Sequence, residues 1–375
     1  MKIVVLADLH IGAVPANILR DELEIFFNYL TEVEPEMIVI AGDMLDKKIS
    51  FNSEDSKLAL QFVERLTSYE SIIRIIRGTR NHDLNQLNNF IHLEERLDLD
   101  FRIINRVTEE QIGLHKFLYV PEEYIENQHD YYKQYLLTEY SMVFGHGTFA
   151  HVGFVSHSQA TEKNMKEAPV FTTDFFKANK ICFGHIHNPS VYKNIYYTGS
   201  YSRWHFGEEE AKGFRMFDLE TNKDYFIENT KARTFVTVDV NKIMHDTKHT
   251  IEEKINLINN YKNKKDIDNL RIKFNNTSDT DVLQIEMLKE YFAKNNSDDI
   301  KISITDLEKQ KQQEENSKYE QEYSFIFNKE YSMAKTLAMY LEKHDNIKLD
   351  EDVIESLLNN EDEEWDNSSK ELSHY

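Results

Sequence analysis

The chain has only one cysteine, Cys182, among its 375 residues. A disulfide within the chain is therefore excluded, and the composition fits a reducing compartment. The 5 prolines and 11 glycines are too few for a largely disordered chain. No apolar run approaches the roughly 18 residues that a membrane span requires. The N-terminal apolar stretch is also too short for a signal peptide, so we expect a soluble cytoplasmic protein with no membrane partner.

Positive charge is scarce as well. The 44 Lys and Arg residues are outnumbered by 66 Asp and Glu residues, which gives a formal net charge of −22. A protein that coats nucleic acid by itself is usually basic, so this balance counts against that class. An enzyme whose site is made positive by bound metal ions stays compatible with it. Apolar residues make up 40% of the chain, enough for two or three modules with proper cores.

Apolar patterns in the first part of the chain predict a layered α/β domain. Continuous apolar runs at residues 3–7, 37–40 and 72–76 are typical of strands buried on both faces. Helical spacing of apolar residues predicts helices at 17–33 and 54–68 between these strands. Such alternation implies parallel pairing through right-handed crossovers. Later strands of the same domain are predicted at 142–144, 181–183, 195–197 and 214–219.

The remaining patterns divide the chain into four predicted segments: residues 1–225, 226–305, 306–327 and 328–375. The first is the layered domain. The second is a small α/β unit, with strands at 233–240, 270–274 and 300–304 and a helix at 281–293. The third is a charged linker. The fourth contains two short amphipathic helices, at 328–343 and 350–359, followed by an acidic tail.

Five polar clusters each follow one of the predicted strands. They are Asp8-Leu9-His10, Gly42-Asp43, Asn81-His82-Asp83, Gly145-His146-Gly147 and Gly184-His185-Ile186-His187. In an open α/β sheet the carboxyl ends of the strands lie at one edge, where ligands bind. Imidazole and carboxylate together suit Mn, Fe or Zn better than Mg or Ca. The set exceeds what one ion requires, so the sequence favours a two-metal site of the kind that hydrolyses phosphoesters.

The motifs DLH, GD, NHD, GHG and GHIH, in this order, resemble the signature of the calcineurin-like metallophosphoesterase superfamily over residues 8–187. Within it, GDMLD at 42–46 and TGSYSRWHFGEEEAKGF at 198–214 are similar to the SbcD (Mre-eleven-type) family of DNA repair nuclease subunits. The small α/β unit lies where that family has its DNA-capping domain. The two terminal helices lie where it docks on an ATPase partner.

The resemblance implies a site with two Mn²⁺ ions, with Mg²⁺, Fe or Zn as possible replacements. One ion would be held by Asp8, His10, Asp43 and His187. The other would be held by Asp43, Asn81, His146 and His185, with Asp43 as the bridge. His82 would face the scissile phosphate and protonate the leaving oxygen or stabilise charge. Asp83 would orient that imidazole or cap the next helix.

Two residues, Thr79 and Arg80, stand between Gly78 and Asn81, where the family has Gly directly before Asn. The loop must therefore bulge. We expect the bulge to be absorbed so that Asn81 still reaches a metal.

Three further residues are candidate contacts for the substrate: Arg80, Tyr201 and Arg203. Arg80 could contact phosphate, with a solvated side chain as the alternative. Tyr201 and Arg203 could touch DNA, with packing under the sheet as the alternative.

The function implied by this resemblance is that of a dinuclear metal-dependent DNA nuclease, a 3′-to-5′ exonuclease and endonuclease. It would act within an SbcCD-like double-strand-break repair and recombination complex. The implied partners are DNA, an SbcC-type coiled-coil ATPase and a second copy of the chain. The implied location is the nucleoid in the cytoplasm, or the host cytoplasm for a phage gene.

Two alternatives share these motifs: a phosphatase or nucleotide phosphodiesterase, and a non-catalytic scaffold with the same fold. The chain after residue 233 favours the nuclease, because a small-molecule enzyme has little need of a cap and a docking segment. The scaffold is disfavoured because all seven ligand positions are filled.

Overall fold

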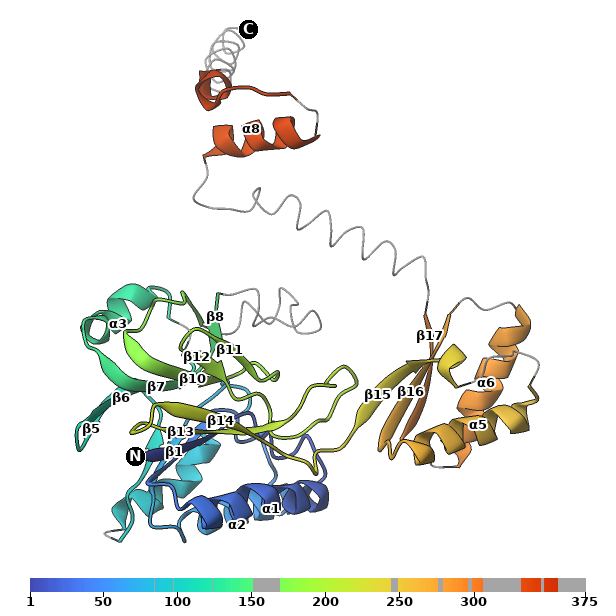
Figure 1. Cartoon of the computed structure of the whole chain (residues 1–375), viewed down its shortest axis with the longest axis horizontal. Helices are drawn as coiled ribbons and strands as arrows, with labels where there is room; N and C mark the ends of the chain where they lie inside the picture. Colours follow the sequence, from blue (N-terminus) through green and yellow to red (C-terminus); the bar gives the residue numbers. More distant parts are fainter. Residues whose placement is uncertain are drawn as a thin grey trace, which may run out of the picture. The chain divides into compact units, whose positions relative to one another are not determined.

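The structure is a computed structural model (Figure 1). It describes the whole chain except residues 84, 97, 124, 151–168, 244–248, 276–278, 296–298, 306–331, 345–346 and 357–375. The predicted linker at 306–327 and the acidic tail lie outside the described residues. Two compact units can be distinguished: Met1–Ile272 with Gln284–Ile302, and Lys273–Leu283 with Ser303–Tyr375.

The first sheet of the large unit has the strand order β14-β13-β1-β2-β3-β4. Its strands are β1 (Lys2–Leu6), β2 (Met37–Ala41), β3 (Ile72–Ile76), β4 (Phe101–Ile104), β13 (Gly213–Asp218) and β14 (Lys223–Glu228). β1 to β4 are parallel, whereas β13 and β14 are antiparallel to their neighbours. The predicted strands at 3–7, 37–40, 72–76 and 214–219 and the parallel pairing are therefore confirmed.

The second sheet has the order β11-β12-β10-β7-β6-β5. Its strands are β5 (Thr108–Ile112), β6 (His115–Val120), β7 (Tyr140–His146), β10 (Ala178–Gly184), β11 (Ser190–Tyr192) and β12 (Ile195–Tyr197). The inner strands β6, β7, β10 and β12 are parallel. The predicted strands at 142–144, 181–183 and 195–197 lie in this sheet. A short parallel pair, β8 (Thr148–Phe149) and β9 (Val170–Phe171), follows β7.

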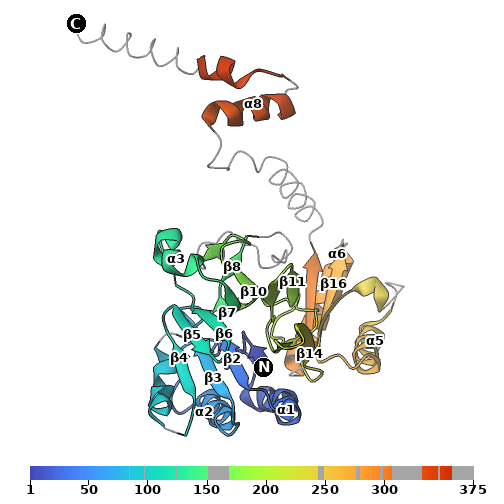
Figure 2. The same ribbon diagram turned by 60° about the vertical axis from the view of Figure 1, so that its left-hand side comes forward.

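The two sheets pack face to face, and helices cover their outer faces. Along β2, the side chains of Val39 and Ala41 enter the core between the sheets, while those of Ile38 and Ile40 face the helices. Each central strand is thus buried on both faces, as its continuous apolar run predicts. On the outer face of the first sheet lie α1 (Ala16–Val33), α2 (Glu54–Leu66) and η1 (Gln86–Glu95), with α1 and α2 side by side in Figure 2. α3 (Gln128–Leu136) packs on the second sheet through Tyr132. The predicted α/β sandwich is confirmed.

A buried ion pair also joins the two sheets. Arg74 of β3 is fully buried and donates from Nε and Nη2 to the Glu110 carboxylate of β5 at 2.9 and 2.7 Å. Tyr119 Oη donates to the same carboxylate at 2.9 Å. The sequence places Arg74 in the middle of an apolar strand. The charge is tolerated there because of this pairing and a second ion pair, from Nη2 to Asp100 Oδ1 at 2.7 Å.

A three-stranded sheet, in the order β15-β16-β17, lies after residue 233. Its elements are β15 (Phe235–Asp239), η2 (Val240–Lys242), α5 (Ile251–Lys264), β16 (Asn269–Asn275), α6 (Asp279–Lys294) and β17 (Ile300–Thr305). Thr250 and Glu253 form a capping box that fixes the start of α5, a helix that the apolar pattern did not predict. The described residues also include α8 (Met333–His344) and a helical segment at 351–356. Among the described helices, none is both long enough and apolar enough to cross a membrane.

Candidate metal centre

The loops at the carboxyl ends of the central strands are tied to one another by hydrogen bonds. Asp8 N donates to Gly42 O at 3.1 Å. His10 N donates to Asp43 O at 3.0 Å, so the loop after β1 lies along the loop after β2. His185 N donates to both carboxylate oxygens of Asp8, at 2.9 and 3.0 Å, and so connects the second sheet to the first. Strand ends from both sheets therefore meet at one place.

The backbone at this place is strained. Four candidate ligands have a positive φ: Asp8 (49°), His10 (46°), Asp43 (49°) and His185 (94°). Such conformations cost about 1–3 kcal/mol each and persist mainly at functional sites, where the surroundings enforce them. Gly42 also has a positive φ, and a Cβ atom there would overlap the ring of His146. The glycine before Asp43 is therefore required for the imidazole to approach.

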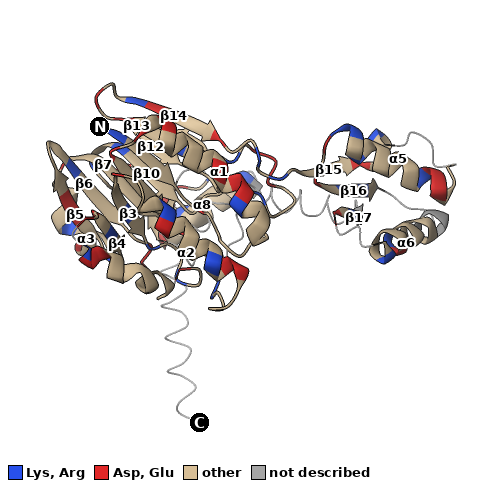
Figure 3. Ribbon diagram, turned by 90° about the horizontal axis from the view of Figure 1, so that it is seen from below, with Lys and Arg blue, Asp and Glu red and all other residues tan. Residues whose placement is uncertain are grey.

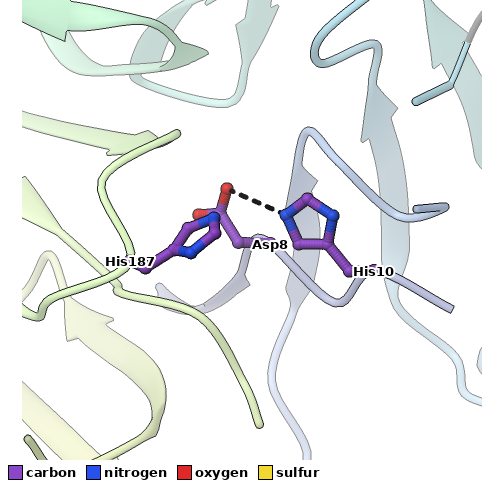
Figure 4. Close-up of side chains that lie close together, drawn as sticks. All are labelled: Asp8, His10 and His187. Atoms are coloured by element: carbon purple, nitrogen blue, oxygen red, sulfur yellow. Dashed lines mark ion pairs between the residues drawn. The ribbon is translucent and has the colours of Figure 1, made fainter. Parts of the chain in front are cut away.

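Asp8, His10 and His187 form the first candidate cluster (Figure 4). Each offers a ligand atom, and these atoms lie within 4.8 Å of one another. His10 Nε2 is 3.9 Å from Asp8 Oδ1, and the ring centroids of His10 and His187 are 5.1 Å apart. The fully buried nitrogens of His10 make no hydrogen bond with the described residues. Buried polar atoms normally have partners, so this cluster fits a bound cation.

Asp8, Asp43 and His146 form an overlapping cluster with the same 4.8 Å limit. His146 Nδ1 is 2.9 Å from Ala41 O, so Nδ1 donates to this carbonyl and Nε2 is the nitrogen that can bind a metal. His146 Nε2 lies 3.2 Å from Asp43 Oδ2 and makes no hydrogen bond within the described part of the chain. A carbonyl that orients the far side of an imidazole is typical of metal-binding histidines.

Asp43 lies between the two clusters. Its Oδ2 atom is 3.7 Å from His10 Nε2 and 3.2 Å from His146 Nε2. Its carboxylate therefore reaches an imidazole of each group, which is the geometry that a bridging ligand requires.

Charges within the centre compensate one another. Burial alone would raise the pKa of the Asp43 carboxyl, but the His146 and His10 imidazoles lower that pKa well below its ordinary value. Burial opposes protonation of His146, yet Asp43 and the other carboxylates raise its pKa well above the ordinary value. The pKa of His10 is raised in the same way, against burial, by Asp46, Asp43 and Asp8. His10 and His146 therefore keep their protons to a higher pH than ordinary imidazoles do, and a metal that binds them must displace these protons.

We therefore expect the affinity for Mn²⁺ to rise with pH. A histidine with a raised pKa stays protonated to a higher pH, and a protonated imidazole cannot bind metal. Below that pKa, each displaced proton changes the dissociation constant about tenfold per pH unit. Calorimetric titration with MnCl₂ at several pH values, in buffers of different ionisation enthalpy, should show tighter binding at higher pH and proton release. Equal affinity at every pH would contradict this account.

His82 lies beside the first cluster. Its half-buried ring meets the ring of His10 edge-on, with centroids 4.7 Å apart. Its Nδ1 atom is buried and makes no hydrogen bond to any residue that the structure describes. Asp46 completes this group, with Oδ1 3.6 Å from His10 Nδ1. The structure thus brings His82 to the border of the centre, next to the candidate metal ligands. The family resemblance implies that this residue protonates the leaving oxygen or stabilises charge.

The Asp83 carboxylate has a different use from those predicted. It is fully buried and accepts N–H groups from Asp43 at 3.1 Å, Leu45 at 3.1 Å and Gly78 at 2.7 Å. Burial, and then the charge of Asp43, raise the pKa of Asp83 to about 7. No hydrogen bond joins Asp83 to His82 in the described structure. Asp83 therefore holds the loops after β2 and β3 together, and the brace for His82 that the sequence suggested is not seen.

The extra residues Thr79 and Arg80 are absorbed as a helical turn. The N–H groups of His82 and Asp83 donate to Thr79 O at 2.9 and 3.1 Å. The turn places Thr79 next to Asp43: Thr79 N donates to Asp43 Oδ1 at 2.6 Å, and the hydroxyl donates to Asp43 Oδ2 at 3.0 Å. Arg80 and Asn81 are exposed on the turn. The structure therefore does not bring Asn81 into the buried cluster.

Three residues at the centre are absent from the ligand set that the sequence predicts. Glu122 follows β6 and lies 3.5 Å from His146 Nε2 and 3.3 Å from His185 Nδ1. Glu208 Oε1 is 3.3 Å from His187 Nδ1, which orients that ring. The Trp204 ring lies 4.8 Å from that of His10. Glu122 carried a signal, since it closes an apolar strand as the other clusters do. Trp204 and Glu208 lie within the stretch 198–214 that carries the family resemblance.

Tyr201 and Arg203 are used within the fold. Tyr201 is fully buried and its hydroxyl donates to Glu22 O at 2.6 Å, so it packs in the core, the alternative to a DNA contact. The Arg203 guanidinium donates to the backbone oxygens of Glu210 at 2.7 Å and Ala232 at 3.1 Å. The guanidinium donors of Arg203 are therefore used in hydrogen bonds to the chain's own backbone.

Known proteins share part of this sequence. A curated relative, the SbcD subunit of the nuclease SbcCD from Staphylococcus epidermidis, is 27% identical over 257 residues, which cover 60% of this chain and 67% of the relative. One solved structure aligns over 61% of this chain and 99% of its own, with a TM-score of 0.38 and 11% identity, a similarity too low to support an argument.

The calcineurin-like phosphoesterase family matches residues 1–227, the part of the chain that forms both packed sheets and the loops of the centre. Proteins of this family use a dinuclear metal site, and the overlapping His and carboxylate clusters provide for one here. On the match and the clusters together, the chain belongs to the calcineurin-like phosphoesterase family.

Proposed function

We propose that this chain is the nuclease component of an SbcCD-like complex and hydrolyses DNA phosphodiester bonds as a 3′-to-5′ exonuclease and endonuclease. The observation that carries the proposal is the pair of overlapping candidate metal clusters, Asp8-His10-His187 and Asp8-Asp43-His146. The Asp43 carboxylate lies near an imidazole of each, and His82 lies at their border. The relationship to the SbcD component of an SbcCD nuclease supports DNA as the substrate. Manganese is the proposed metal, because mixed imidazole and carboxylate ligands suit it.

The residues of the centre have separate tasks in this proposal. Asp8, His10 and His187 would hold one cation, and Asp43 would be shared with a second one. Bound in this way, the two ions supply Lewis acidity toward a phosphodiester and toward water. His82 donates a proton to the leaving oxygen or stabilises the charge that develops there, because its ring lies beside the cluster and is half-buried.

The charge distribution bears on how DNA is bound. In Figure 3, acidic and basic residues both occur on α1, α2 and α5. Since the chain carries a net charge of −22, phosphate binding must rely on the cations and on partner proteins. We infer a homodimer that works with an SbcC-type coiled-coil ATPase, in the bacterial nucleoid or in the host cytoplasm if a phage carries the gene.

The proposed activity is tested with end-labelled duplex DNA in the presence and absence of Mn²⁺. The expected result is manganese-dependent cleavage that is lost in Asp43→Asn, because that change removes the shared ligand. The same preparations are assayed with p-nitrophenyl phosphate and its bis ester. Cleavage of the small esters alone would favour a phosphatase or nucleotide phosphodiesterase. A wild-type protein that binds no Mn²⁺, Fe or Zn from excess metal would favour a scaffold.

The proposed partner is tested separately, by co-purification with the product of the neighbouring gene. Recovery of an ATPase with a long coiled coil is the expected result. A chain that purifies alone and is fully active without ATP would contradict the assignment to an SbcCD-like complex.

A further inference from the structure

We propose that Glu122 is a ligand of the second metal position, together with Asp43, His146 and His185, in the place that the sequence gives to Asn81. The inference rests on the proposed function, because it concerns the second cation of the same centre. It assigns a metal ligand to the end of β6, a sixth strand end beside the five that the motifs identify.

The position of Glu122 is fixed by the second sheet. It follows β6 and Pro121, and its N–H donates to Arg77 O at 3.2 Å, which ties it to the end of β3. β6 is parallel to β7, the strand that ends at His146, so both side chains leave the sheet at the same edge. The residue is only 7% exposed. A buried carboxylate needs a positive partner or donors to compensate its lost hydration.

The contacts of Glu122 point to a cation as that partner. Its Oε2 atom lies 3.5 Å from His146 Nε2 and 3.3 Å from His185 Nδ1, and ligand atoms of all three residues lie within 4.8 Å of one another. A second observation is independent of Glu122. His146 Nε2 is fully buried, is the ring nitrogen left to bind a metal because Nδ1 contacts Ala41 O, and makes no hydrogen bond within the described chain. This nitrogen lies close to both carboxylates, 3.2 Å from Asp43 Oδ2 and 3.5 Å from Glu122 Oε2.

The turn after β3 explains why Glu122 takes this position. The turn exposes Asn81 and leaves Thr79 against Asp43. The Thr79 hydroxyl lies 3.0 Å from Asp43 Oδ2 and 3.3 Å from Glu122 Oε2, so it can orient either carboxylate. Where an amide oxygen of Asn81 would have bound metal, the structure offers the oxygen of Glu122.

This exchange changes the charge of the second position. Two carboxylates and two imidazoles carry one negative charge more than a set with an amide. The additional charge strengthens binding of a divalent cation and favours ions that accept oxygen ligands, such as Mn²⁺. It also reduces the Lewis acidity of the bound ion. We therefore expect the second ion to be held tightly, which a displaced Asn81 would not have provided.

The test measures metal binding directly. Wild-type protein, Glu122→Gln, Glu123→Gln and Asn81→Ala are dialysed against increasing Mn²⁺, and bound manganese is determined by mass spectrometry. Glu123 is a matched control, because its carboxylate pairs with Arg77 at 3.0 Å and with Tyr131 Oη at 2.7 Å instead. Wild type, Glu123→Gln and Asn81→Ala should bind two ions. Glu122→Gln should keep one ion and bind the second at least about tenfold more weakly.

Several outcomes would overturn the inference. They are two ions with unchanged affinity in Glu122→Gln, loss of the second ion in Asn81→Ala, and fewer than two ions in the wild type. Melting curves without metal show whether each variant is folded, and Glu122→Asp gives a second carboxylate variant, expected to bind the second ion with intermediate affinity. If the wild type binds two ions in the expected pattern but leaves DNA intact, the proposed function fails while the assignment of Glu122 stands.

Discussion

Replacement of His82 by alanine is expected to lower the rate of phosphodiester cleavage by about 10²- to 10⁴-fold and to leave both metal ions bound. The His82 ring borders the centre, 4.7 Å from the His10 ring, but the Asp8-His10-His187 and Asp8-Asp43-His146 clusters do not include it. In the proposed mechanism, loss of His82 removes the proton donor and slows the chemical step, whereas the candidate metal ligands stay in place. Single-turnover cleavage of labelled DNA and manganese content, measured on the same preparation, check the prediction.

His205 provides a matched control for this experiment. It is an exposed histidine next to Trp204, and it belongs to none of the candidate metal clusters among the described residues. His205→Ala should therefore cleave at the wild-type rate. His146→Ala should lose manganese as well as activity, because its Nε2 atom faces Asp43 at 3.2 Å. A His82→Ala protein that cleaves at the normal rate would remove His82 from the mechanism.

Replacement of Arg74 by methionine is expected to destabilise the large unit by about 3–5 kcal/mol. The change leaves the Glu110 carboxylate, whose side chain is 10% exposed, without its main counter-ion between the two sheets. Such a loss corresponds to a fall of roughly 6–20 °C in melting temperature for a domain of this size. Differential scanning calorimetry at fixed metal concentration measures it.

Arg102 serves as the control, because it also pairs with Glu110, at 3.1 Å, but is 54% exposed. Arg102→Met should cost no more than about 1 kcal/mol. The effect of Arg74→Met should depend on pH. Burial disfavours the Glu110 charge, but Arg74 lowers the pKa of Glu110 below its ordinary value. The stability that the Arg74–Glu110 pair contributes is present above the pKa of Glu110 in the unfolded chain. It is lost as the pH falls through the lower pKa of Glu110 in the folded protein. The difference in the free energy of unfolding between wild type and Arg74→Met should therefore become smaller below about pH 4. If this difference in the free energy of unfolding did not change with pH, the effect of Arg74→Met would come from lost packing contacts alone.

The elements that the sequence predicted best are those whose burial leaves a local pattern. β2 and β3 are apolar on both faces because helices cover one face and the other sheet covers the second. β5 was missed because its residues Thr108–Ile112 are only partly buried and largely polar. The assignment of each strand to one of the two sheets was not predicted, since each inner strand has the same apolar character wherever it pairs.

Local sequence patterns also failed to reveal the partners of buried charged residues. Arg74 interrupts an apolar strand, and its partner Glu110 lies 36 residues away in the other sheet. No local pattern connects the two. The Asp83 carboxylate, expected to brace His82 or cap a helix, instead accepts N–H groups from three loop positions that come together only in the folded chain.

The sequence alone determined the chemistry of this protein: imidazoles and carboxylates behind buried parallel strands, in the order of one phosphoesterase family. It could do so because strand direction places all these donors at one edge of the sheets. Only the tertiary structure decided which side chains reach the centre. The turn at Thr79 exposes Asn81, and the pairing of β6 with β7 brings in Glu122. Which side chains point inward depends on hydrogen bonds and strand pairings between distant segments. The spacing of residues along the sequence does not reveal these contacts.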